Sequence, residues 1–233
     1  MTDTPSFPGF ETAAFAWLDD IAAENSRDGF AALRPTYDAE VRGPFASLLA
    51  ECASWCGGEP RVFRQLRDLR FEKHRQKPYW ESIAGEITWP GRVTAWIVQL
   101  SPEGLTAMAG CRRAFRPDEL ARYRAAVDED GPGVELDDIT RSLELLRFSV
   151  CGSTLRGMPR GFSADHPRAA LLRHTALYGA STLPPSRRRR GRRCVPRDAA
   201  LAHLSAAWAD LEPLVVWLDE HVGHTSPVVE LAA

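Results

Sequence analysis

The sequence predicts an α+β fold, built as a single domain with a central antiparallel sheet flanked by N- and C-terminal helices. Two observations support this class. Apolar residues recur at helical spacing near both chain ends, and the middle of the chain reads as short strands joined by turns. The chain has 233 residues and 44% hydrophobic content, which is enough to bury one sizeable core. We therefore expect residues 1–233 to form one domain.

The N-terminal part predicts two helices. Residues 11–24, ETAAFAWLDDIAAE, carry apolar side chains on one helical face. The next residues, NSRDGF, are turn formers and are expected to end that helix. A second helix is expected from Pro35, because proline is tolerated in a first turn. Within it, Gly43 and Pro44 are expected to kink or split the helix.

The middle of the chain predicts strands. Short loops separate the candidates, so neighbouring strands are expected to pair antiparallel. The expected strands are 61–71 (RVFRQLRDLRF), 82–89, 93–100 and 105–110.

The C-terminal half predicts mostly helices. DGPG at 130–133 is expected to end the first of them, and a long Gly- and Pro-rich loop is expected before a short helix near Pro167. The residues 174–181 favour one more strand, and the Pro- and Arg-rich segment 184–197 is expected to be a flexible loop. The expected long helices are 116–130, 136–147 and 198–222.

Composition excludes several classes of protein. The formal net charge is −2, so the overall field does not indicate a nucleic-acid or membrane protein. No apolar run is long enough for a membrane span, and MTDTPSFPGF has no signal-peptide pattern, so we expect a cytoplasmic protein. The five cysteines are odd in number and form no CxxC pair, so no disulfide framework and no metal site are predicted. No motif identifies a cofactor.

The stretch RDLRFEKHRQKPY at 67–79 predicts an anion site. Its cations include Lys73 and Lys77, the only two lysines in an arginine-rich chain. Arginine presents a planar fork to phosphate or carboxylate, and lysine a point charge. The alternative interpretation is a charged sheet face whose ion pairs are internal, because structural networks gather the same residue types.

A second polar segment, GSTLRGMPRGFSADHP at 152–167, combines loop-forming residues with ionisable ones. Asp165 and His166 are adjacent, and histidine titrates near neutral pH, so the pair could transfer a proton. The simpler interpretation is that one of them caps the helix expected at Pro167.

The segment SRRRRGRRC carries six arginines in seven residues, which suits nonspecific contact with nucleic acid or an acidic protein. It has no interleaved aromatic residue for base stacking. The arginines are Arg187, Arg188, Arg189, Arg190, Arg192 and Arg193.

The chain resembles a bacterial family known as domain of unknown function 2461. The resemblance covers about residues 7 to 221 and rests on ordered blocks, of which the most specific are RDLRF and PRGFSADHP. The other blocks are NSRDGF, RPTYDAEVRGPF, FRQLRDLRFEK, KPY, QLSPEGLTAMAG, FRPDELARYRAAV, GSTLRGMPRGFSADHPRAALLRH and PLVVWL. The resemblance implies a single α+β domain and no established activity.

The resemblance also groups residues into two blocks, which leads to our first hypothesis: a pocket, with or without enzymatic activity, for an anionic small molecule. Its ligand-binding residues would be Arg67, Arg70, Lys73, Lys77, Arg160 and Arg173. Its proton-transferring or orienting residues would be Asp68, Tyr79 and His166. This hypothesis requires the two blocks to converge in space. The second hypothesis is a non-catalytic module that grips nucleic acid or an acidic protein, and the third is an ion-pair network without a ligand.

Overall fold

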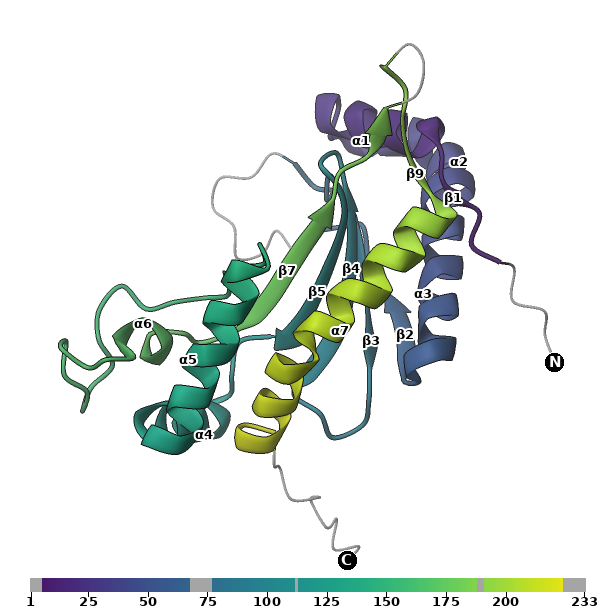
Figure 1. The fold of residues 1–233 in the computed structure, drawn as a ribbon. Coiled ribbons are helices and arrows are strands. Elements are labelled where there is room, and N and C mark those ends of the chain that lie inside the picture. Colours follow the sequence, from purple (N-terminus) through teal and green to yellow (C-terminus); the bar gives the residue numbers. More distant parts are fainter. Residues whose placement is uncertain (1–5, 68–76, 112, 188–190, 224–233) are drawn as a thin grey trace, which may run out of the picture. The chain divides into compact units, whose positions relative to one another are not determined.

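The computed structural model describes residues 6–67, 77–111, 113–187 and 191–223 (Figure 1). Its helices are α1 (Thr12–Ala23), α2 (Arg27–Thr36), the π-helix η1 (Tyr37–Arg42), α3 (Gly43–Cys56), α4 (Pro117–Asp128), α5 (Asp130–Leu145), α6 (Ala169–Leu172) and α7 (Arg197–His221). Its strands are β1 (Gly9–Phe10), β2 (Glu59–Val62), β3 (Ile83–Thr88), β4 (Thr94–Ser101), β5 (Gly104–Cys111), β6 (Ser149–Cys151), β7 (Tyr178–Leu183), β8 (Ser186–Arg187) and β9 (Arg193–Pro196).

These elements confirm the α+β class. A six-stranded antiparallel sheet has the order β2-β3-β4-β5-β7-β6, and a small three-stranded sheet has the order β1-β9-β8. The first four strands of the larger sheet are consecutive in the chain, and short turns join β3 to β4 and β4 to β5, as expected of antiparallel neighbours. The smaller sheet joins the N-terminal strand β1 to β9, with Phe10 opposite Val195.

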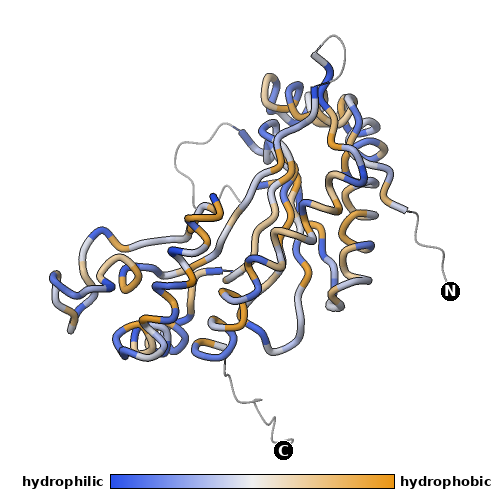
Figure 2. Tube along the Cα trace, in the orientation of Figure 1, coloured by the Kyte–Doolittle hydropathy of each residue, from blue (hydrophilic) through white to orange (hydrophobic). Residues whose placement is uncertain are grey.

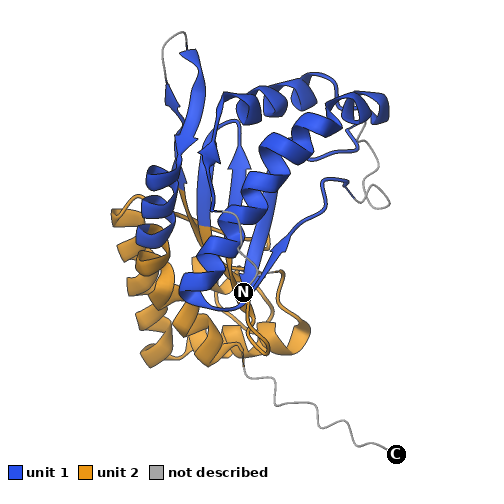
Figure 3. Ribbon diagram, turned by 90° about the vertical axis from the view of Figure 1, so that its right-hand side faces the viewer, with its two compact units in different colours: residues 1–87, 97–107, 182–206 blue, residues 88–96, 108–181, 207–233 orange. Residues whose placement is uncertain are grey.

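The chain divides into two compact units, coloured separately in Figure 3. Unit 1 consists of Met1–Ile87, Ile97–Ala107 and Thr182–Ala206. Unit 2 consists of Thr88–Trp96, Met108–Ser181 and Ala207–Ala233. Each unit has buried apolar residues of its own, and each is described separately below.

Unit 1 has an aromatic core. Trp17 of α1 is fully buried and contacts Phe30 and Tyr37, with ring centroids 6.4 and 4.9 Å away. The ring centroids of Phe10 in β1 and Phe45 in α3 are 6.3 Å apart. The residues that supply this core recur along the helices between hydrophilic ones, an alternation that Figure 2 shows along α3.

The turn expected at NSRDGF is instead the beginning of α2. The Ser26 hydroxyl accepts a hydrogen bond from the Gly29 backbone N–H at 2.9 Å, and Asp28 lies in the first turn. Both features stabilise a helix N-terminus, so the helix begins eight residues before Pro35. Pro35 therefore lies near the end of α2 and not in a first turn, which corrects the expectation.

The π-helix η1 lies between Pro35 and Pro44. Neither proline has a backbone N–H, so each removes one hydrogen bond of a regular α-helix. The backbone N–H of Gly43 donates to the carbonyl of Asp38, five residues earlier, which is the π-helical pattern. The expected break at Gly43 and Pro44 is thus a change from π- to α-helix.

The first expected strand is shorter than predicted. Strand β2 ends at Val62, and Leu66 pairs with Tyr79 in an isolated antiparallel bridge. Part of the expected range 61–71 lies outside the described residues. Strands β3, β4 and β5 agree with the prediction to within a residue or two, and the expected loop 184–197 contains the paired strands β8 and β9.

In unit 2, DGPG does not simply end a helix. Helix α4 ends at Asp128, Glu129 is extended, and α5 begins at Asp130 with Pro132 in its first turn. The buried Arg168 side chain donates to the carbonyls of Val127 and Asp128, at 2.7 and 2.9 Å. It thereby satisfies two of the carbonyls that the end of a helix leaves free.

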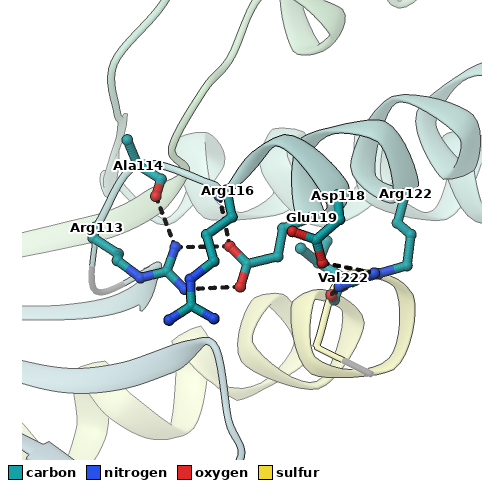
Figure 4. A network of polar contacts seen from close by, with 7 residues as sticks. All are labelled: Arg113, Ala114, Arg116, Asp118, Glu119, Arg122 and Val222. Carbon is teal, nitrogen blue, oxygen red and sulfur yellow. Dashed lines mark hydrogen bonds and ion pairs between the residues drawn. The ribbon is translucent and has the colours of Figure 1, made fainter. Parts of the chain in front are cut away.

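A charged network anchors the N-terminus of α4 (Figure 4). The Glu119 carboxylate, whose side chain is 1% exposed, accepts two hydrogen bonds from the Arg113 guanidinium, both 2.7 Å long. It also accepts one from the Arg116 backbone N–H at 2.7 Å. Arg122, one turn further along, donates to the Val222 carbonyl at the end of α7. The network ties the loop before α4 to the helix itself.

This network predicts a pH-dependent contribution to stability. The hydrogen bonds from Arg113 hold the pKa of Glu119 below its ordinary value of 4.5, and burial opposes this shift. A carboxyl with a lowered folded-state pKa stabilises the fold above its ordinary pKa, and the stabilisation is lost as pH falls through the folded-state value. We expect Glu119→Gln to lower the free energy of unfolding by about 1–3 kcal/mol at pH 7. The difference in the free energy of unfolding between wild type and variant should become smaller as pH falls from 5 towards 3.

Urea denaturation of the two proteins across this pH range measures this difference. Arg141→Gln is the control, because Arg141 makes an exposed ion pair with Asp137 on α5. Such a pair contributes little, so this variant should stay within about 0.5 kcal/mol of wild type. If the difference in the free energy of unfolding between wild type and Glu119→Gln did not change with pH, the ionised Glu119 carboxylate would not be the source of the stabilisation.

Candidate functional site

A cleft in unit 1 gathers basic and aromatic side chains. Its volume is about 680 Å³. Helix α2 and η1 line one part of it, and the segment 62–66 together with Tyr79 lines the other. Its lining residues are Arg27, Phe30, Ala31, Arg34, Tyr37, Asp38, Arg42, Val62, Phe63, Arg64, Gln65, Leu66 and Tyr79.

The charge of this cleft is strongly positive. It is lined by four arginines and a single acidic residue, Asp38. The Arg34 Nε atom lies 3.5 Å from the Asp38 carboxylate, which offsets the positive charge of Arg34. Arg27, Arg42 and Arg64 are exposed and have no carboxylate partner among the residues that the structure describes. Three cations without a carboxylate partner in the described part of the chain therefore line one concave space.

Asn25 fixes Tyr79 at the edge of the cleft. Its side-chain amide donates to the Tyr79 carbonyl at 3.0 Å and accepts from the Tyr79 N–H at 2.9 Å. The Tyr79 ring stacks on Phe30 of α2, with centroids 4.2 Å apart and planes 10° apart. The polar clamp and the ring stack together hold the segment around Tyr79 against α2.

Tyr37 supplies a phenol to the cleft. Burial raises the pKa of Tyr37 above its ordinary value of 10, and the nearby Arg42 opposes this shift. The phenol therefore stays protonated at neutral pH. Its hydroxyl makes no hydrogen bond to another described residue, so it can donate one to a ligand.

The predicted basic stretch contributes only part of the cleft. Around the Leu66–Tyr79 bridge, the Arg67 N–H donates to the Pro78 carbonyl at 2.8 Å and the Trp80 N–H to the Gln65 carbonyl at 2.9 Å. The Arg67 guanidinium lies over the Trp80 ring, 4.3 Å from its centroid. The Arg67 Nε is buried and has no hydrogen-bond partner in the described part of the chain.

The remaining candidates of this stretch are placed as follows. Lys77 is exposed and pairs with Glu81 at 2.6 Å. Tyr79 lines the cleft. Asp68, Arg70 and Lys73 lie outside the described residues.

The second predicted block belongs to unit 2. The Nδ1 atom of His166 accepts from the Arg168 backbone N–H at 3.0 Å, so Nε2 carries the proton and faces the Asp128 carboxylate at 3.2 Å. Arg160 is exposed, and Arg173 is half-buried beside His174. Because the first block lies in unit 1, convergence of the two blocks stays a prediction.

The arginine run is structurally heterogeneous. Arg193 contacts the Asp19 carboxylate, donates to the carbonyls of Phe15 and Pro102, and covers the Phe15 ring. Its guanidinium is thus engaged within unit 1. Arg187 and Arg192 are exposed, whereas Arg188, Arg189 and Arg190 lie outside the described residues.

A second cleft, of about 510 Å³, lies in unit 2 between α5 and residues of α7. Its ionisable lining residues are all acidic: Glu135, Asp138 and Asp210. It does not suit an anion, so the unit 1 cleft is the better match to the predicted chemistry. In the described ranges, His, Cys, Asp and Glu form no group of three able to hold a metal ion.

Sequence reasoning missed the helical half of the cleft. Arg27, Arg34 and Arg42 were not among the predicted site residues, and Arg27 and Arg34 precede Pro35, where the second helix was expected to begin. Two signals could have found them. Ser26 followed by Asp28 is an N-cap pattern, and Arg27, Phe30, Ala31 and Arg34 then recur at the spacing of one helical face.

Fold and cleft together define an α+β protein with an arginine-lined site. Residues 13–217 match the family model described as conserved hypothetical protein (DUF2461), and the chain belongs to this family. The match confirms the resemblance identified from the sequence. Comparison with curated proteins and with solved structures gives no match. Within the described residues, no helix is both long and apolar enough to cross a membrane.

The Asn25 clamp predicts a measurable loss of stability. Asn25→Ala removes both hydrogen bonds to the partly buried Tyr79 backbone and leaves two polar groups unpaired. We expect the free energy of unfolding to fall by about 1–3 kcal/mol in urea denaturation. Ser54→Ala on the exposed face of α3 is the control and should stay within about 0.5 kcal/mol of wild type. Equal stability of the two variants would show that the clamp contributes nothing.

Proposed function

We propose that the protein binds a small molecule bearing a phosphate or carboxylate group in the unit 1 cleft. The observation that carries the proposal is the charge excess: Arg27, Arg42 and Arg64 line the cleft without a carboxylate partner among the described residues. A planar guanidinium pairs with phosphate or carboxylate through two parallel hydrogen bonds. The ligand would supply negative charge to these three arginines, since Asp38, the acidic residue among the described lining, pairs with Arg34.

Electrostatics favours a ligand over a purely structural role. Like charges that share a concave surface repel one another, and a bound anion removes this repulsion while it gains charge-assisted hydrogen bonds. The cleft volume of about 680 Å³ is also within the usual size range of small-molecule sites. The cleft as unit 1 forms it has both properties, without a contribution from the second block.

The π-helix gives independent support. Such helices are rare, and they frequently occur at functional sites. Here η1 contributes Tyr37, Asp38 and Arg42 to the cleft. We assign Tyr37 as a hydrogen-bond donor to the ligand and Tyr79 as a wall of the site.

The competing hypothesis is a module that binds nucleic acid through the arginine run. The engagement of Arg193 with Asp19 leaves fewer free cations for that role. Binding to nucleic acid would weaken steeply with salt because phosphate contacts release counterions. A DNA or RNA titration at several salt concentrations is therefore the direct test of this alternative.

The proposal predicts that one exposed arginine controls anion affinity. We expect inorganic phosphate, titrated at constant ionic strength, to raise the melting temperature of the wild-type protein. Arg64→Gln should weaken phosphate binding about tenfold, because a hydrogen bond to a charged group is worth about 1.5–3 kcal/mol. The variant should fold normally, since Arg64 is exposed and unpaired within the described chain.

The matched control is Arg141→Gln, which removes the same charge from the surface of α5 in unit 2. Its phosphate affinity should stay within about twofold of wild type. If both variants weakened binding equally, the effect would come from net charge and not from the cleft. If phosphate left the wild-type melting temperature unchanged, the proposed site would be wrong.

A further inference from the structure

The cleft has an apolar part that a simple anion would leave unused. Phe63 and Leu66 both line it, and they are 36% and 57% exposed. Val62 and Ala31 add further apolar surface. Large apolar side chains gathered in a concave, otherwise basic site are typical of a place where something apolar binds.

We infer that the ligand of this cleft is an organic anion with a flat, apolar body, such as an aryl phosphate or aryl carboxylate. The inference rests on the proposed function and specifies its ligand class. The arginines would bind the anionic group, and Phe63 and Leu66 would contact the body.

The lining favours a flat body over a flexible aliphatic one. Phe30 and Tyr79 already stack nearly parallel at the cleft, so the site contains ring surfaces in fixed positions. Arg61 lies 5.4 Å from the centroid of Phe63 and pairs at 2.6 Å with the buried Glu86, so that ring too has a fixed neighbour. Guanidinium planes and aromatic rings both stack on flat partners. A planar ligand can therefore use both kinds of residue without the entropy loss of a flexible chain.

The hydrophobic contribution can be separated from the ionic one. Phenyl phosphate and glycerol 1-phosphate are both phosphate monoesters, and they differ in the polarity of the group attached to the phosphate. Covering Phe63 and Leu66 with a phenyl ring removes apolar surface from water, whereas glycerol gains little from the same contact. We expect the wild-type protein to bind phenyl phosphate at least about tenfold more tightly than glycerol 1-phosphate.

Leu66→Ser tests which residues produce this preference. Leu66 is more than half exposed, so the variant should fold. It should reduce the preference for phenyl phosphate to about threefold or less and leave the affinity for glycerol 1-phosphate unchanged. Leu145→Ser, at a residue 83% exposed on α5 in unit 2, is the matched control and should leave both affinities unchanged. Isothermal titration calorimetry at fixed ionic strength measures the dissociation constants of both esters for the wild type and for each variant.

The outcomes separate this inference from the function on which it rests. Equal binding of the two esters, with a tenfold loss for each in Arg64→Gln, would overturn the flat apolar ligand and leave the anion site intact. A preference that persists in Leu66→Ser would also overturn the inference. Binding of neither ester, or binding that does not depend on Arg64, would overturn the anion site and the inference together.

Discussion

The clamp between Asn25 and the backbone of Tyr79 is the contact on which the cleft depends. Asn25 is the only asparagine of the chain, and its amide satisfies both polar groups of one residue 54 positions away. Through Tyr79, the clamp holds the short ladder of residues 65–67 and 78–80 beside α2. The stack of Tyr79 on Phe30 adds apolar contact to the polar one. This junction fixes the two walls of the cleft to each other at its aromatic edge.

The partners of each arginine distinguish structural cations from candidate ligand-binding ones. Arg61 pairs with Glu86, Arg113 with Glu119 and Arg197 with Glu51. Glu86 and Glu119 are buried and Glu51 is partly buried. An unpaired buried charge is costly, so the folded state requires a partner for these carboxylates. Arg64 is exposed and pairs with no buried carboxylate among the described residues. In a chain with so many arginines, this difference is more informative than their number.

The sequence was a good guide to the fold and a partial guide to the site, for physical reasons. Helices α1 and α7 and strands β3 to β5 follow from periodicity, because their apolar faces alone determine which side is buried. The beginning of α2 was missed because Gly29 and Asp28 look like turn residues when Ser26 is not recognised as a cap. Tyr79, predicted as a site residue from the basic block, lines the cleft, and its role there stays a prediction. The cap pattern at Ser26 could have placed Arg27 on a helix, but not beside Tyr79, because that proximity depends on tertiary contacts between distant segments.

The π-helix explains how Arg42 comes to line the same cleft as Tyr37. Residues five apart in an α-helix point in directions that differ by about 140°. In η1 the hydrogen bonds join residues five apart, as between Gly43 and Asp38, so Tyr37 and Arg42 lie on nearly the same side of the helix. The neighbouring core is preserved, since Val41 and Phe45 stay fully buried. The segment thus carries buried positions at Val41 and Phe45 beside the cleft residues Asp38 and Arg42.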